Sequence, residues 1–133
     1  MDQSALHGSP ASGAVSTVDD LVRLVDGLPR LLAGETWSRM TTPHLPELSG
    51  VLPGYGRHAP NPWGLGPELR AEKSPHWTGT TNSPFTWGHF GRGGTFVWVD
   101  PAVRHSLIVL TDRPFGDWAH DRWPALSDAV LAA

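Results

Sequence analysis

The feature that most constrains the fold is a glycine-bordered run at residues 88–101, GHFGRGGTFVWVDP, followed by a second apolar run at 105–111. Residues 95–99 alternate between two sets that must face opposite ways in a strand: Thr95, Val97 and Val99 against Phe96 and Trp98. An Asp-Pro pair turns the chain between the two runs. The pattern predicts antiparallel strands joined by tight turns. Because 105–111 is apolar on both faces, we expect an interior strand covered on both sides.

Composition limits the classes of protein to which this chain can belong. Its 133 residues fit one compact domain or a portion of a larger one. A net charge of -3 leaves no basic surface for nucleic acid, and no apolar run approaches the ~20 residues that cross a bilayer, so neither nucleic acid nor membrane is an expected partner. The absence of cysteine excludes disulfides and thiolate chemistry. The first ten residues lack the pattern of a secretory signal, so we expect a cytoplasmic location.

Helical periodicity marks both ends of the chain. Ser16 or Thr17 is suited to cap a helix over residues 17–33, because apolar residues recur there every three or four positions. Pro29 should kink or interrupt this helix, and Gly34 should mark its end. A second helix is expected over 117–132, packed across the sheet.

The remaining segments are less regular. Residues 1–14, rich in Gly, Ser, Ala and Pro, predict a poorly ordered leader before a partial domain at 15–133. Residues 35–61 show no sustained periodicity and predict a long wrapping loop with room for one helical turn, a kind of segment that often borders a functional surface. Residues 63–70 predict a strand, and 71–85 a polar loop. The expected architecture is α+β: an antiparallel sheet of about three strands packed by an N-terminal and a C-terminal helix.

Several short motifs carry a resemblance to a known family. They are Val15–Leu21, Trp63–Gly66, His89-Phe90-Gly91 with Gly94-Thr95, Trp98–Pro101 and Leu110–Arg113. In this order and spacing they resemble the carboxyl-terminal portion of the serine β-lactamase-like family, which includes class C-type β-lactamases, D,D-peptidases and esterases. The resemblance covers Ser16 to Leu131 and implies the C-terminal half of a β-lactamase/transpeptidase-like fold.

The resemblance also implies a serine hydrolase site. In such enzymes a Ser-x-x-Lys, a Tyr-x-Asn and a Lys- or His-x-Gly strand meet across one cleft. His89-Phe90-Gly91 matches the third motif, so His89 would have a supporting catalytic role, orienting substrate or relaying a proton. Gly91, Arg92 and Gly94 would bind substrate, and a backbone N–H near Gly91 to Arg92 would join the oxyanion hole. The implied substrate is a small ester, amide or lactam, and no cofactor is implied.

The first two motifs are absent from this chain. Lys73 is the only lysine and Arg70 stands three residues before it; Tyr55 is the only tyrosine and Arg57 stands two residues after it. The chain is therefore interpreted as a fragment that a missing N-terminal portion would complete, or as a degenerate relative. Either way we expect no hydrolysis by the chain alone. Its open sheet edge is a possible pairing site for another chain.

Other chemistries fit the sequence less well. No metal site is expected, because His76, His89 and His120 lie far apart and form no His-x-x-x-His pair. A Ser83–His89–Asp100 triad lacks the Gly-x-Ser-x-Gly elbow that would expose a nucleophile.

Two alternatives from other classes remain. The seven tryptophans should mostly fill the core, yet a groove around Trp63, Trp77 and Trp87 would suit a non-catalytic module that stacks on a sugar or peptide. The chain would otherwise be a structural partner protein whose open sheet edge pairs with another polypeptide.

Overall fold

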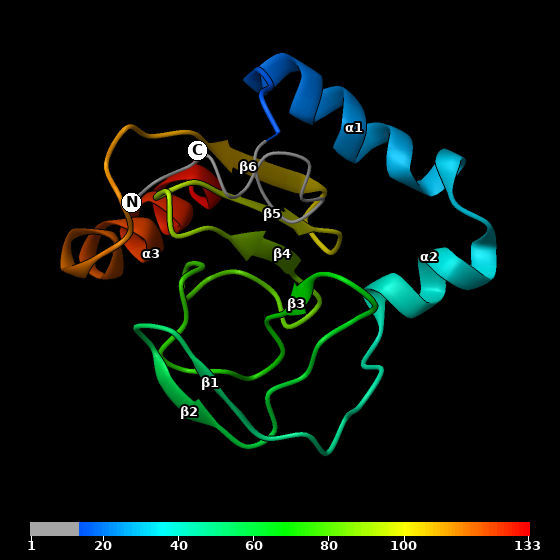
Figure 1. The fold of residues 1–133 in the computed structure, drawn as a ribbon, viewed down its shortest axis with the longest axis horizontal. Helices are drawn as coiled ribbons and strands as arrows, with labels where there is room; N and C mark the ends of the chain where they lie inside the picture. The colour runs from blue at the N-terminus through cyan, green and yellow to red at the C-terminus, as the bar shows by residue number, and fades with distance from the viewer. Residues whose placement is uncertain (1–13) are drawn as a thin grey trace.

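The computed structural model describes residues 14–133, so the expected leader lies outside the described residues except for its last position. The α+β class is confirmed (Figure 1). The elements are α1 (Val18–Leu31), α2 (Gly34–Thr41), β1 (Gly50–Leu52), β2 (Gly56–His58), β3 (Glu68–Leu69), β4 (Trp87–Phe90), β5 (Phe96–Asp100), β6 (His105–Val109) and α3 (Asp117–Leu131).

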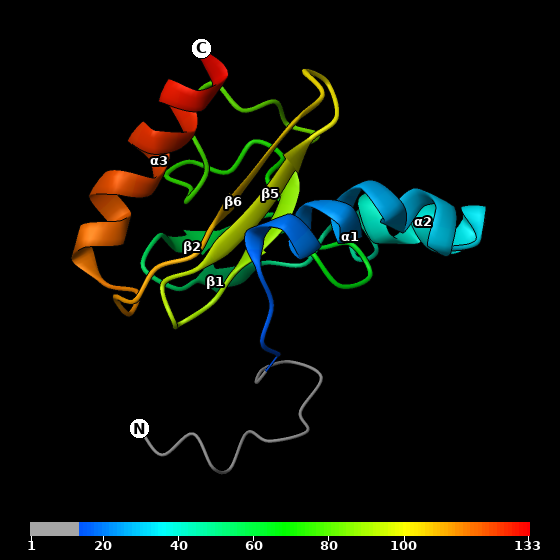
Figure 2. The same cartoon turned by 90° about the horizontal axis from the view of Figure 1, so that it is seen from above.

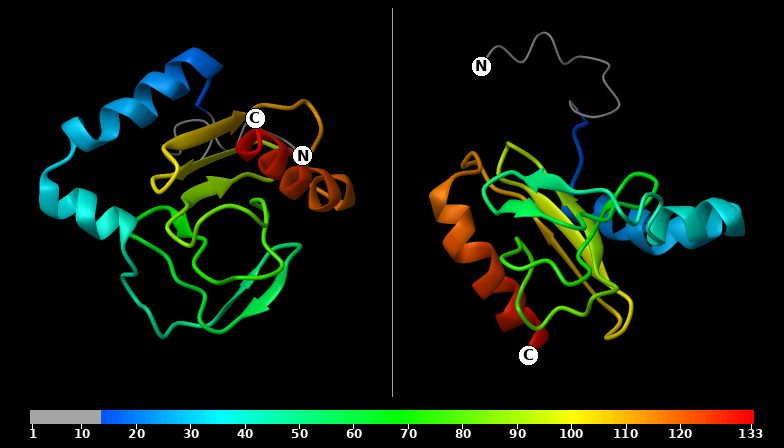
Figure 3. Two further views of the ribbon diagram at one scale, coloured as in Figure 1. Left: turned by 180° about the vertical axis from the view of Figure 1, so that it is seen from behind. Right: turned by 90° about the horizontal axis from the view of Figure 1, so that it is seen from below.

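The main sheet has four antiparallel strands in the order β3-β4-β5-β6, one more than the expected three or so. Strands β1 and β2 form a separate antiparallel hairpin. Helix α3 covers one face of the main sheet, and α1 lies on the opposite side (Figure 2; Figure 3, right). One face of the sheet is therefore packed against α3, and the opposite face is turned toward α1.

The N-terminal helix is close to its predicted bounds. Thr17 caps it, its hydroxyl accepting a hydrogen bond from the Asp20 N–H at 3.2 Å. Pro29 lies inside α1 without interrupting it. Gly34 does not simply follow a helix end, because it starts α2, where Glu35 and Arg39 pair at 2.8 Å on adjacent turns. No helix within residues 14–133 has the length and apolar character needed to cross a membrane.

The prediction of one long loop over 35–61 is wrong. This stretch contains most of α2 and the β1–β2 hairpin, whose turn places Gly54 and Gly56 at φ of 80° and 88°. Strands of three residues are too short for alternation to stand out in a sequence. The Pro-Gly pair at 53–54 is the turn signal that would have located the hairpin.

The strand expected over 63–70 shrinks to the two residues of β3, with one isolated bridge between Trp63 and Glu68. The preceding residues bind the end of α2 instead: the Leu65 N–H donates to the Arg39 carbonyl at 2.8 Å. A side chain on Gly64 would collide with the Met40 carbonyl, so glycine lets α2 dock here. Gly64 and Leu65 therefore contact helix α2 and do not pair with a neighbouring strand.

The two faces of β5 follow the predicted alternation, with Phe96 and Trp98 buried and Val97 half-buried. Helix α3 was predicted to pack across the sheet, and it does so through Ala119, Trp123 and Ser127, spaced four residues apart. The Ser127 hydroxyl accepts a hydrogen bond from the Trp98 indole N–H at 3.0 Å. This bond ties the helix to the middle of the sheet.

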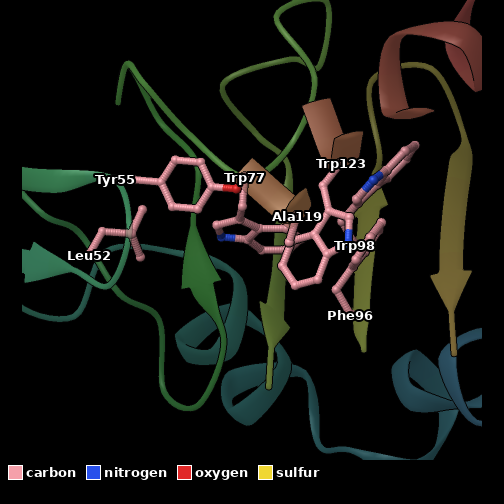
Figure 4. Close-up of a cluster of buried hydrophobic side chains, with 7 residues drawn as sticks. All are labelled: Leu52, Tyr55, Trp77, Phe96, Trp98, Ala119 and Trp123. Atoms are coloured by element: carbon pink, nitrogen blue, oxygen red, sulfur yellow. The ribbon is translucent and has the colours of Figure 1, made fainter. Parts of the chain in front are cut away.

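Aromatic side chains dominate the core, as predicted for most of the tryptophans. Figure 4 shows the cluster, to which the hairpin, a loop, β5 and α3 contribute Leu52, Tyr55, Trp77, Phe96, Trp98, Ala119 and Trp123. Trp77 is 1% exposed and Trp87 5% exposed. The prediction of a ligand groove lined by three tryptophans is wrong, because Trp77 and Trp87 are buried in the core and Trp63 is half-buried.

The expectation of an interior, fully covered strand over 105–111 is also wrong for this chain. The strand spans His105–Val109 and is the last in the sheet, and within residues 14–133 no other strand pairs with its outer edge. None of its residues is buried. Residues 14–133 therefore do not fully bury the apolar side chains of this strand.

Three carboxylates hold the irregular segment 70–86 in place. Asp128 on α3 accepts hydrogen bonds from Thr80 and Thr81, and Asp100 at the end of β5 accepts two from Ser83. The third, Glu68, accepts hydrogen bonds from three side chains of the same segment: Lys73, His76 and Trp77. Segment 70–86 thus owes its conformation to polar contacts, of which those to Glu68 are buried.

Candidate active site

His89 lies on β4, opposite Val97 of β5, and its side chain is exposed. The flanking residues show why the ring points outward. Phe90 faces the core against Trp77 and Trp123, at centroid distances of 5.7 and 5.6 Å. Since successive side chains of a strand alternate, His89 must face the side of the sheet that α1 approaches.

A cavity of about 210 Å³ opens beside His89. Helix α1, the β4–β5 hairpin and the segment after β6 line it through Leu21, His89, Phe90, Gly91, Thr95, Phe96, Val97 and Leu110. Thr95 is the only hydroxyl side chain among these lining residues. The cavity thus combines an imidazole and a hydroxyl with apolar walls, the composition of many small-molecule sites.

Trp63 contacts the imidazole edge to face, with ring centroids 5.5 Å apart and an interplanar angle of 64°. Trp63 is itself held by the bridge to Glu68 on β3. The indole therefore restricts the orientation of the His89 ring. Sequence reasoning missed this contact because Trp63 lies 26 positions before His89 and only strand pairing brings them together.

The glycine-rich turn has distinct roles at its three predicted positions. Gly91 lines the cavity, and its N–H donates to the Thr95 carbonyl at 2.9 Å, so that N–H is already engaged. Arg92 is exposed at the turn, and its carbonyl accepts a hydrogen bond from the Phe115 N–H. Gly94 is buried at a φ of 85°, where a Cβ would collide with the Arg113 carbonyl. Gly94 thus shapes the turn and does not line the cavity.

Neither the only lysine nor the only tyrosine of the chain has a side chain that is free to take part in a reaction. Lys73 forms a buried ion pair with Glu68, and their side chains are 2% and 1% exposed. Burial opposes ionisation of Glu68, yet the hydrogen bond and charge of His76 and the charge of Lys73 outweigh it and hold the pKa of Glu68 below its ordinary value. Tyr55 is in the core, where burial raises the pKa of its phenol.

The other combinations of polar residues do not form sites. The Ser83 hydroxyl donates to Asp100 at 2.6 Å, which makes this pair a loop clamp. His76 is buried against Glu68, and His120 stacks on Tyr55 with centroids 4.6 Å apart. Among residues 14–133, no three His, Asp or Glu side chains gather closely enough to hold a metal ion.

Two comparisons with known proteins give matches over most of the chain. The β-lactamase family model matches residues 1–131. A crystal structure of a β-lactamase from Mycobacterium bovis is similar at 55% sequence identity, with a TM-score of 0.83. The match covers 88% of this chain and 44% of that chain, so this chain spans less than half the length of that relative. A search of curated proteins found no match.

Proposed function

Because this chain belongs to the β-lactamase family, we propose that it supplies the histidine-bearing wall of a serine hydrolase site. The reaction proposed for the completed site is acyl transfer from a small ester, amide or lactam to a serine, followed by hydrolysis. The serine and its base come from the part of the fold that this chain does not span. In this reading the chain is one portion of a hydrolase and not a degenerate relative.

The observation that carries the proposal is the exposure of His89 at the cavity between α1 and the β4–β5 hairpin. Its ring is not sealed among apolar side chains, as that of Trp123 is. His89 instead has its ring steadied by Trp63 and faces a space of about 210 Å³. Such a group can orient a substrate carboxyl or pass a proton within the site.

The hydrogen bond made by the Gly91 N–H supports a choice between the two candidate oxyanion donors, Gly91 and Arg92. The Arg92 N–H makes no hydrogen bond within residues 14–133, whereas that of Gly91 is bound to Thr95. We therefore propose the Arg92 N–H as this chain's donor to the developing oxyanion, with Gly91 leaving room for the acyl group. The exposed Arg92 side chain lies at the same turn and would contact the leaving part of the substrate.

The buried state of Lys73 and Tyr55 explains the expected inactivity of the chain alone. A base must reach within about 3 Å of the proton that it removes. Lys73 is ion-paired to Glu68 under the sheet edge, and Tyr55 is enclosed in the aromatic core. Neither can replace the absent Ser-x-x-Lys or Tyr-x-Asn residues.

Hydrolysis assays test the proposal. We call the part of the M. bovis chain outside the matched 44% the complementary segment. The chain alone should not turn over nitrocefin or p-nitrophenyl esters, whereas joining it to the complementary segment should restore turnover. His89→Ala in the joined protein should lower kcat/KM by about 100-fold or more, the scale of a lost acid–base group.

The control for that substitution is His44→Ala, because the side chain of His44 is also exposed but lies outside the cavity. It should leave kcat/KM unchanged. Sustained turnover by the chain alone that is lost in His89→Ala would contradict the need for an outside nucleophile. Full activity of the joined His89→Ala protein would contradict the role given to the imidazole.

A further inference from the structure

Three buried polar side chains with no role in the proposed reaction gather at β3, the strand that pairs with the strand of His89. They are Asn61, Glu68 and Lys73, which are 6%, 2% and 4% exposed. The Lys73 ammonium donates to the Glu68 carboxylate and, at 3.0 Å, to the Asn61 side chain. Replacing a buried ion pair by apolar side chains often costs no stability, so the value of such a pair can lie in the conformation that it selects.

The ion pair is tied to the segment that carries Trp63. The Lys73 ammonium also donates to the Pro62 carbonyl at 3.4 Å, so it binds the two residues that directly precede the tryptophan. Glu68 forms the isolated bridge with Trp63. Both members of the pair therefore hold the backbone from which the indole projects.

The ion pair is also tied to the strand that carries His89. Glu68 pairs with Gly88 in the β3–β4 register, one position before the imidazole. The Trp77 indole N–H at 2.7 Å and His76 Nε2 at 3.1 Å donate to the same carboxylate as the ammonium does. With three side-chain donors around it, the carboxylate has one orientation. The backbone beside His89 therefore cannot shift without disrupting the contacts of a buried charge.

His76 leaves the charges of this cluster balanced. The Thr78 N–H donates to His76 Nδ1 at 3.2 Å, so that nitrogen acts as an acceptor and Nε2 carries the proton given to Glu68. Burial lowers the pKa of His76, which also favours the neutral ring. Among these side chains, one carboxylate faces one ammonium, and loss of Lys73 alone removes that balance.

We propose that the Lys73–Glu68 pair is a positioning group for His89 and acts through Trp63. The pair keeps the segment of the indole and the strand of the imidazole in one relative position. The indole, with its centroid 5.5 Å from that of the imidazole, then restricts rotation of the His89 ring at the cavity. A displacement of about 1 Å in a reacting group can cost about 100-fold in rate. The consequence for catalysis rests on the proposed function, whereas the positioning is a property of this chain alone.

Nuclear magnetic resonance of the chain alone tests the positioning without any reaction. The ring protons of His89 are identified by the loss of their signals in His89→Ala. The neighbouring indole should displace these signals from those of a free histidine, and Trp63→Leu should abolish the displacement. Lys73→Met should remove most of it, because the released segment no longer holds the indole against the imidazole.

Asn61→Ala guards against a Lys73→Met protein that does not fold. It removes the ammonium's acceptor next to Trp63 but leaves the ion pair with Glu68 intact, so no buried charge loses its partner. The His89 signals should move in the same direction as in Lys73→Met, by a smaller amount.

Kinetics of the chain joined to the complementary segment test the consequence for the reaction. Trp63→Leu should lower kcat/KM by about 10- to 100-fold, and Asn61→Ala should lower it by a smaller factor. Neither should lower it further once His89→Ala is present, since an absent imidazole cannot be misplaced. Ser127→Ala is the matched control, because it removes a buried hydrogen bond on the face of the sheet that α3 covers. It should leave the His89 signals and kcat/KM unchanged.

The two readouts separate this inference from the proposed function. His89 signals that respond to Trp63→Leu and Asn61→Ala, in a chain whose joined form hydrolyses nothing, would support the positioning and contradict the proposed function. Unchanged His89 signals in either Asn61→Ala or Lys73→Met, if the variant folds, would overturn the inference. Equal losses of kcat/KM with and without the imidazole would also overturn it, because they would indicate a purely structural role for Trp63.

Discussion

Replacing Lys73 by Met tests whether the buried ion pair maintains the fold around segment 70–86. The Lys73 ammonium donates to Glu68, to the Asn61 side chain at 3.0 Å and to the Pro62 carbonyl at 3.4 Å. Met has a similar volume but leaves the Glu68 carboxylate buried without its cation. Removing one partner of a buried pair typically costs about 3–5 kcal/mol. That is a large share of the roughly 5–15 kcal/mol by which a domain is stable.

Urea unfolding followed by tryptophan fluorescence measures this cost. Glu68→Gln should destabilise the protein by a similar amount, since it leaves the ammonium unpaired. The double variant should lose about 2 kcal/mol less than the sum of the two single losses, because neither charge is then left alone. Arg39→Met is the control: it breaks the exposed pair with Glu35 and should cost less than about 1 kcal/mol.

The pH dependence of the free energy of unfolding provides a second test of the Glu68 contribution. The pKa of Glu68 is lowered in the folded protein, so its contribution to stability is complete above the unfolded pKa, about 4.3. It is lost as the pH falls through the folded pKa. The stability difference between the parent and Glu68→Gln should therefore shrink below about pH 4.3. A Lys73→Met cost under 1 kcal/mol, or additive single variants, would refute this account of the segment.

Two further predictions concern the sheet and its turn. Gly94→Ala should destabilise the protein by about 1–3 kcal/mol, because it combines a positive φ with a collision at the Arg113 carbonyl; Gly93→Ala, with open space around its Cβ position, should leave the thermal midpoint almost unchanged. Ser127→Ala should cost about 1–3 kcal/mol by leaving the buried Trp98 indole N–H without an acceptor. An unchanged urea midpoint in the serine variant would mean that this bond does not hold α3 to the sheet.

The sequence was most informative where periodicity extends over many residues. Helices α1 and α3 and the two faces of β5 follow from repeats of apolar side chains at helical or strand spacing. The short elements β1, β2 and β3 were missed or overextended, since two or three residues carry too little pattern. The prediction that β6 is covered on both sides was wrong. An apolar strand sequence indicates that the side chains favour burial, but it does not show which segments of this chain lie over them.

The candidate site divides in the same way. The glycine-bordered motif located His89. The contact with Trp63, the engaged N–H of Gly91 and the burial of Lys73 depend on strands and loops that are distant in sequence. No local pattern encodes such contacts.

Residue order along this chain settled its class, its long helices and the histidine at the sheet, because backbone geometry repeats at short range. Only folding in three dimensions decided which polar groups became buried partners and which apolar surfaces stayed open. The physical reason is that burial and hydrogen bonding depend on every segment that arrives at a point in space. Within residues 14–133, the segments that pack against α1 and β6 leave both elements partly exposed.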